Sequence, residues 1–227
     1  WDLKPAWAFV AWRPNDEWLL RAGRLRLPLY LHSESLNIGV AHDMARLPVE
    51  MYSIAPTNEY KGLSVGYALP STWLPDSELG IEAYAGRTDA TARFWARDGA
   101  PPQLAPGARF ITVDVRVAGL LATLRNPATT LRLGVHEAQT GQFGSGTPMS
   151  YPYVGLAPGL GYYRVSEALP GPDIPTVGRI RNRIVTLGAE HRFGGGWRLG
   201  AELASNQQHR TELGSNTRGG YVALFKD

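Results

Sequence analysis

Apolar and polar residues alternate along most of this chain, in stretches of roughly ten residues separated by turn-forming residues. Alternation with a period of two predicts β-strands whose two faces differ in character. No long stretch repeats apolar residues at the spacing of a helix. Strands are expected at 5–13, 18–28, 60–69, 78–87, 108–124, 130–139, 179–193, 197–208 and 217–226.

The connections between these strands alternate in length. "PNDE", "PSTWLPDS", "NPAT" and "GGG" are short or fairly short and consist largely of turn-forming residues. The segments at about 29–59, 88–107 and 140–178 are long. This rhythm is typical of antiparallel hairpins with one tight end and one elaborated end, so the pattern predicts an all-β antiparallel fold and a single domain over 1–227.

Each expected strand separates an apolar face from a polar one. In 130–139, Leu131, Leu133 and Val135 oppose Arg132 and His136. In "WLLRAGRLRLPLYL", which begins at Trp18, a row of leucines lies on one face and Arg24 and Arg26 lie on the other. In 108–124, a row of β-branched residues opposes Thr112, Asp114 and Arg116. We expect the apolar rows to share one face of the sheet.

Two architectures fit this alternation. In a soluble ligand-binding β-sandwich the apolar faces would pack together. A transmembrane β-barrel fits better, because several strands reach ten residues or more and the polar faces mix Gly, Ser, Glu and Arg. Aromatic residues at expected strand ends also suit an interfacial girdle. These residues are Trp12, Trp18, Trp73, Tyr84, Phe110, Phe193, Trp197 and Phe225.

The number of strands bears on how such a barrel would be completed. The first and last expected strands would both run toward the end with the short turns, whereas a closed even-stranded barrel needs them to run in opposite directions. We therefore expect at least one strand before Trp1, and a chain that is the C-terminal part of a larger barrel of the 16-strand type.

Composition narrows the classes of partner. The chain has 23 Lys and Arg against 20 Asp and Glu, a balance of +3 that gives no argument for nucleic acid as a partner. It has no cysteine, which excludes disulfides and thiolate metal sites. No window of about 18 apolar residues predicts a membrane-spanning helix.

Two stretches carry a resemblance to a known family. "RPNDEWLLRAGRLRLPLYLHSESLNIGVAHDMARLPVEMYSI" and the last strand, "RGGYVALFK", resemble Gram-negative outer-membrane porins and porin-like proteins. The resemblance is specific over about residues 12–60, and the chain departs from the family pattern by ending in Asp227 rather than an aromatic residue. It implies an outer-membrane channel for passive diffusion of small hydrophilic solutes or ions, a homotrimer, and contact with outer-membrane lipid and lipopolysaccharide.

General porins fold one long loop into the barrel, and the resemblance implies that the loop at 29–59 has this role. Carboxylates of the loop facing arginines of the wall would place a transverse field across a narrow pore. The expected constriction and lumen residues are Glu34, Asp43, Glu50, Arg24, Arg26, Arg116 and Arg132. The alternative is that these arginines only hold the wall together by pairing with carboxylates on neighbouring strands, namely Glu78, Glu82, Asp114 and Glu202.

Two further segments face outward in this interpretation. Arg179, Arg181 and Arg183 share a strand face with Val185, so we expect them above the hydrocarbon, at a solvated rim or against lipopolysaccharide head groups. The segment 140–178, rich in Pro, Gly and Tyr, is expected to be a long extracellular loop.

Enzymatic chemistry has little support in the sequence. There is no GxSxG or HExxH motif, and no pair of histidines has the spacing of metal ligands. We expect no enzymatic activity, cofactor or metal. An outer-membrane barrel enzyme stays open as an alternative through "HSES" and "AHDM", which place Ser, His and Asp in one loop.

Overall fold

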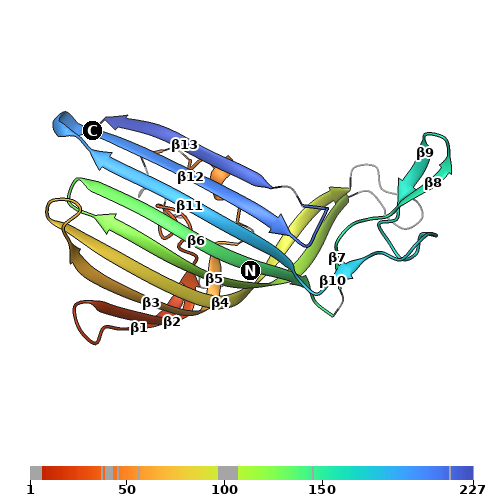
Figure 1. Cartoon of the computed structure of the whole chain (residues 1–227), viewed down its shortest axis with the longest axis horizontal. Coiled ribbons are helices and arrows are strands. Elements are labelled where there is room, and N and C mark those ends of the chain that lie inside the picture. The colour runs from red at the N-terminus through yellow and green to blue at the C-terminus, as the bar shows by residue number, and fades with distance from the viewer. Residues whose placement is uncertain are drawn as a thin grey trace.

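The computed structural model describes residues 7–36, 38, 43–44, 46–55, 57–96, 107–144, 146–214 and 216–226, with backbone alone at 92–96 and 109. The chain is all-β. A nine-stranded antiparallel sheet has the strand order β1-β2-β3-β4-β5-β6-β11-β12-β13, so neighbours in the main sheet follow chain order (Figure 1). β1 and β13 form its two edges.

The nine strands of the sheet confirm the nine predicted from alternation. Their bounds are β1 Ala8–Trp12, β2 Trp18–Arg26, β3 Glu59–Ser71, β4 Ser77–Ala96, β5 Gly107–Arg125, β6 Thr129–Gln142, β11 Ile180–Arg192, β12 Trp197–His209 and β13 Thr217–Lys226. The largest difference is at β4, which continues well beyond its predicted end and stays paired with β5 as far as Ala96 opposite Gly107.

The long segment 140–178 contains two small ribbons in addition to loops. β7 (Thr147–Pro148) pairs with β10 (Thr176–Val177), and β8 (Tyr153–Ala157) pairs with β9 (Leu160–Tyr163). They project beyond the end of the sheet opposite the short turns (Figure 1).

The sheet curls around the segment that follows β2 (Figure 1). We call the described residues between Leu27 and Ala55 the inner segment; it includes the short helix α1 (Val49–Tyr52). Its apolar side chains pack against inward-facing side chains of the sheet in one buried cluster. That cluster includes Leu27, Leu29, Tyr30, Leu47, Met51 and Tyr52 from the inner segment, and Tyr60, Tyr84, Val115, Val117, Leu121, Ala138 and Ala204 from the sheet.

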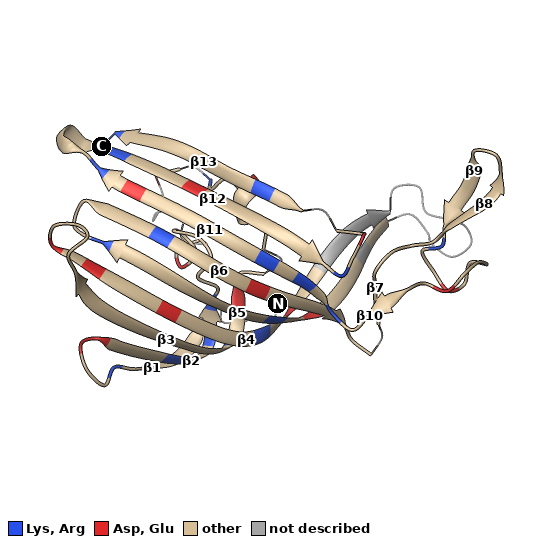
Figure 2. Ribbon diagram, viewed as in Figure 1, with Lys and Arg blue, Asp and Glu red and all other residues tan. Residues whose placement is uncertain are grey.

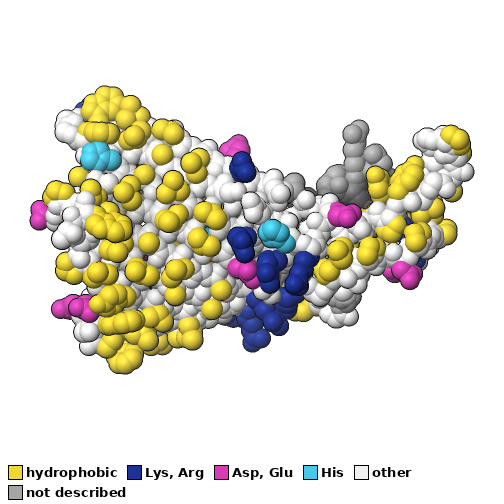
Figure 3. Space-filling model, viewed as in Figure 1, with side chains coloured by type: hydrophobic (Ala, Val, Ile, Leu, Met, Phe, Trp, Pro, Cys, Tyr) yellow, Lys and Arg dark blue, Asp and Glu magenta, His cyan; other side chains and the backbone are white. Residues whose placement is uncertain are grey.

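The outer, convex face of the sheet is apolar and exposed. Leu133 is 50% exposed and Val222 is 75% exposed, although both lie in the middle of strands. Figure 3 shows hydrophobic side chains spread over this face. The exposed set is Leu63, Val65, Ile81, Leu120, Leu131, Leu133, Val135, Val185, Leu187, Leu199, Leu203, Val222 and Leu224.

The concave face carries buried polar side chains among its residues. Ser64, His136, Asn182, Thr186, Glu202 and Asn206 are all buried there. A soluble protein buries its apolar residues and seldom exposes a contiguous apolar surface of this extent. The polarity of this sheet is therefore largely inverted relative to that of a soluble β-protein.

The apolar band on the outer face has two distinct margins. Exposed aromatic side chains lie near the short turns, at Trp12, Trp18, Trp73, Phe193 and Trp197. Tyr84 was expected among them but is buried on the concave face, and Phe110 lies toward the opposite end. At the other margin, Lys61, Arg87 and Arg116 are paired in register on β3, β4 and β5.

The distance between these margins follows from strand geometry. From Ser77 to Arg87 the strand advances about ten residues, or about 33 Å along its own axis.

Two strands face the opposite way from the sequence prediction. On β2, Leu25 is buried on the concave face, and Arg24 and Arg26 share the outer face. On β5, Val115 is buried and Arg116 is exposed on the outer face. The reason is that the inner segment builds an apolar core on the concave side, so an apolar row no longer marks the outer face there.

No helix in the described ranges is long and apolar enough to cross a membrane.

Close packing between α1 and β13 depends on Gly219. A Cβ atom at this position would lie 3.1 Å from the carbonyl oxygen of Glu50. We expect Gly219→Val to displace α1 from the wall at a cost of about 1–3 kcal/mol, because overpacking forces the backbone to move. Trypsin cleavage after the exposed Arg46 should become faster.

Gly66→Val is the matched control, since the nearest heavy atom to its Cβ would be 3.7 Å away. Equal cleavage rates in the two variants would contradict this account of α1 packing.

Candidate functional site

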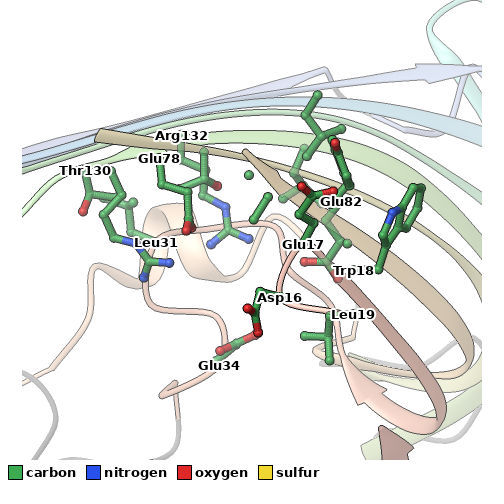
Figure 4. Close-up of a pocket in the computed structure, with 18 of the residues that line it drawn as sticks. Asp16, Glu17, Trp18, Leu19, Leu31, Glu34, Glu78, Glu82, Thr130 and Arg132 are labelled. Atoms are coloured by element: carbon green, nitrogen blue, oxygen red, sulfur yellow. The ribbon is translucent and has the colours of Figure 1, made fainter. Parts of the chain in front are cut away.

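A cavity of about 540 Å³ lies on the concave side, near the short turns. Its wall comes from alternate residues of neighbouring strands, and its floor comes from the inner segment. In Figure 4, Glu78, Glu82 and Arg132 on the wall face Leu31 and Glu34 of the inner segment.

The strands position the wall residues because alternation sends every second side chain to the concave face. β4 contributes Glu78 and Glu82, β6 contributes Thr130 and Arg132, and β11 contributes Glu190. Figure 2 shows the acidic positions of β4, β11 and β12 toward the end of the sheet that carries the short turns.

The charge balance of the cavity is acidic. Its lining includes six carboxylates and three guanidinium groups, counted over the two sets that follow. The carboxylates belong to Asp16, Glu17, Glu34, Glu78, Glu82 and Glu190, and the guanidinium groups to Arg13, Arg125 and Arg132. An excess of fixed negative charge raises the local concentration of cations.

Arg21 connects three elements at the edge of this cavity. Its guanidinium donates to the Glu82 carboxylate on β4 at 2.5 Å and to Ser64 on β3 at 3.0 Å. It also reaches Glu34 of the inner segment at 3.5 Å. Arg21 therefore ties the inner segment to the wall and neutralises part of the acidic charge.

Arg132 holds the backbone of the inner segment. Its guanidinium donates to the carbonyl oxygens of Pro28 at 2.9 Å and Tyr30 at 3.0 Å. Proline interrupts strand pairing because it has no N–H. Arg132 supplies the hydrogen-bond donor for the carbonyl oxygen of Pro28.

Glu202 is the deepest attachment of the inner segment. Its side chain is 2% exposed, and its carboxylate accepts hydrogen bonds from the Leu31 N–H at 2.7 Å, the Tyr52 hydroxyl at 2.6 Å and the Tyr221 hydroxyl at 2.6 Å. Burial raises the pKa of the Tyr52 hydroxyl far above its ordinary value, and the nearby Glu202 charge raises it further. Tyr52 thus stays protonated and keeps donating to Glu202.

Arg198 on β12 attaches a second carboxylate of the inner segment, that of Asp43. Its guanidinium pairs with Asp43 and donates to Glu190 at 2.8 Å. It also lies 4.3 Å from the ring centre of Phe225, which adds a cation–π contact.

The structure brings together some of the predicted site residues and separates others. Glu34, Asp43 and Arg132 all lie between the wall and the inner segment. Glu50 is exposed on α1 near β13. Arg24 pairs with Glu59, and Arg24, Arg26 and Arg116 lie on the outer face instead of the concave face.

Sequence reasoning named Glu78, Glu82 and Glu202 only as partners that hold the wall, and it missed Arg21 and Arg198 as attachments of the inner segment. The alternation that put Glu82 and Glu202 on a polar face was available. Arg21 was missed because the prediction exchanged the two faces of β2, and because its partner Glu82 lies 61 residues away along the chain.

The three arginines that were predicted to stand above the hydrocarbon lie at or just before the start of β11, on the outer side of the sheet. Arg179 pairs with Asp114, and Arg181 lies 3.4 Å from Glu137. Arg183 is exposed on the same face as Val185.

The buried histidine of the wall is held by neutral groups. His136 contacts the Tyr84 hydroxyl at 3.0 Å and the Thr186 hydroxyl at 3.2 Å. His42 of "AHDM" lies outside the described residues. Among the residues that are described, no group of three or more His, Asp and Glu is arranged to hold a metal ion.

Comparison with known proteins finds no family model that matches the chain, no similar curated protein and no similar solved structure.

Replacement of Glu202 by Gln tests its role as the anchor. The amide presents one acceptor and one NH₂ group to three donors, so we expect local opening of the inner segment to become easier by about 2–3 kcal/mol. Hydrogen exchange of the Leu31 amide should accelerate accordingly. Glu78→Gln, a carboxylate of the same face that lines the cavity, is the control. If Leu31 exchanges equally slowly in both variants, Glu202 is not the anchor.

Proposed function

We propose that this chain forms part of an outer-membrane β-barrel channel that passes small hydrophilic solutes or ions by passive diffusion. The observation that carries the proposal is the inverted polarity of the nine-stranded sheet. Its outer face exposes residues such as Leu133 and Val222, whereas its concave face buries Glu202 and Asn206. A surrounding hydrocarbon phase makes such an arrangement favourable.

The dimensions of the outer face support the same proposal. At the tilt of about 40° that is usual in barrels, the stretch of about 33 Å between the two margins would span about 25 Å, which is the height of the apolar band of outer-membrane barrels. Exposed tryptophans at one margin, including Trp73 and Trp197, suit the membrane interface, where an amphipathic ring contacts both headgroups and water.

Closure of the sheet is a further part of the proposal. Hydrocarbon does not tolerate unpaired strand edges, because their N–H and C=O groups would lack partners. β1 and β13 are the edges of the nine-stranded sheet. We propose that further strands close it into a larger barrel of the 16-strand type, and that three such barrels associate.

The inner segment would narrow the pore. It crosses the concave face from Glu34, bound to Arg21 on β2, to α1 beside Gly219 on β13. Solutes would pass beside it through the polar cavity, limited by size and by fixed charge. The surplus of carboxylates there favours cations over anions.

Single-channel recording in a planar bilayer tests the proposal with the full-length protein. We expect discrete conductance steps and, in a salt gradient, a reversal potential that indicates cation preference. A protein that inserts without conducting is not an open channel. One that stays soluble and monomeric without detergent uses its apolar face as a packed core, as a β-sandwich would.

Glu78→Lys tests the role of the cavity carboxylates. A change of two charges is worth roughly 1 kcal/mol for a monovalent ion about 8 Å away in water. The same change favours a monovalent anion by an equal amount, so we expect the ratio of cation to anion permeability to fall roughly thirtyfold. Asp89→Lys makes the same change on the outer face of the same strand and should leave the ratio unchanged. An equal shift in both variants would mean that the cavity does not lie on the conduction path.

A further inference from the structure

The ribbon of β8 and β9 lies far from the cavity and from the outer face of the sheet (Figure 1). Its two faces differ, because side chains alternate along each strand. Tyr153 lies opposite Tyr163 in register, and both belong to one face. Val154 lies opposite Tyr162, and both belong to the other face.

The face with Tyr162 packs against the segment that follows the ribbon. The Tyr162 hydroxyl donates to the carbonyl oxygen of Pro170 at 2.7 Å. The buried guanidinium of Arg164 donates to the carbonyl oxygens of Leu169 at 2.7 Å and Pro172 at 2.6 Å. These bonds fix the conformation of the ribbon, so a ligand on its other face would not have to order it.

The other face is open and aromatic. Tyr153 is 54% exposed and Tyr163 is 63% exposed, and their ring centres lie 5.3 Å apart at an angle of 67°. The hydroxyl end of Tyr153 lies over Gly161, where a Cβ atom would come within 2.4 Å of the hydroxyl oxygen. A Cβ atom at Gly155 would meet no heavy atom within 4 Å. We call Tyr153, Tyr163, Gly155 and Gly161 the tyrosine face; Figure 3 shows hydrophobic side chains exposed on this ribbon.

The tyrosine face carries no charge. The charged residues of 147–178 are Arg164, Glu167 and Asp173. Arg164 pairs with Glu167 at 2.7 Å and lies 3.9 Å from Asp173, on the packed side of the ribbon. An ionic ligand would lose its hydration on the tyrosine face without gaining an opposite charge, so a neutral ligand fits better.

The size of the tyrosine face limits the kind of partner. Five residues of a strand span about 17 Å, and two strands are about 10 Å wide, which gives an area of about 170 Å². A stable protein–protein interface covers about 800 Å² of each partner. The tyrosine face therefore fits a small ligand and not a folded protein or a second copy of this chain.

We propose that the tyrosine face binds a neutral oligosaccharide by stacking of its sugar rings. The face of a pyranose ring presents C–H groups with partial positive charge, which the negative face of an aromatic ring attracts. The tyrosine hydroxyls can donate to and accept from the sugar hydroxyls. The open space over Gly155 admits a sugar ring close to the backbone. This site lies outside the cavity, so the inference does not depend on conduction.

The test measures binding of maltohexaose and cellohexaose to the full-length protein by isothermal titration calorimetry, in a detergent without a sugar headgroup. We expect saturable binding of at least one of them. Each aromatic contact contributes about fivefold to affinity, so Tyr153→Ala with Tyr163→Ala should lower the affinity about twenty-five-fold. Phenylalanine at both positions keeps the rings and should lower the affinity only a fewfold. Leu156→Ala with Leu160→Ala removes exposed apolar side chains from the tip of the same ribbon and should leave the affinity unchanged.

Three results would overturn the inference. They are no saturable binding of either sugar, equal affinity in the wild type and the tyrosine-to-alanine variant, or an equal loss in the leucine variant. The last result would indicate a general apolar surface instead of stacking. A protein that binds sugar in detergent but does not conduct in a bilayer would contradict the proposed channel and leave the tyrosine face intact.

Discussion

The rest of the structure depends on the hydrogen bonds that the buried carboxylate of Glu202 accepts. A charge removed from water is tolerated only when hydrogen bonds satisfy it. Here three donors do so, from Leu31, Tyr52 and Tyr221. Leu31 and Tyr52 belong to the inner segment. If the segment left the concave face, the carboxylate of Glu202 would therefore lose two of its three donors. One acidic side chain thus holds both ends of the inner segment against β12 and β13.

The inner segment in turn divides the concave face into two environments. On one side its leucines and Met51 form an apolar core with Val115 and Val117 of β5. On the other side it faces the acidic cavity, where Arg132 binds its backbone carbonyls. The same segment therefore both stabilises the curl of the sheet and sets the charge of the remaining space.

Much of the fold could be predicted from alternation, because the outer face is uniform. On β6 the residues Leu131, Leu133 and Val135 are all exposed, as a period of two requires. The faces of β2 and β5 could not be predicted this way. Their inward residues, such as Leu25 and Val117, are apolar because they contact the inner segment, and nothing local in the sequence records that contact.

The candidate site was less predictable than the fold for the same reason. Glu34 and Asp43 were identified as acidic residues of the loop, but their partners Arg21 and Arg198 depend on how the loop crosses the sheet. The bond from Leu31 to Glu202 joins residues 171 apart in the sequence. Pairings over such separations follow from the three-dimensional path of the chain and not from residue type or spacing.

The central claim is that the outer face of the sheet contacts lipid. A scan of single cysteines along β6, from Thr130 to Glu137, tests it directly, because the chain has no native cysteine. Each cysteine carries a fluorophore, and quenching by nitroxide-labelled lipid is measured in vesicles. We predict strong quenching at Leu131, Leu133 and Val135 and weak quenching at the positions between them. Absence of alternation, or stronger quenching at Arg132 and Gly134, would contradict the account.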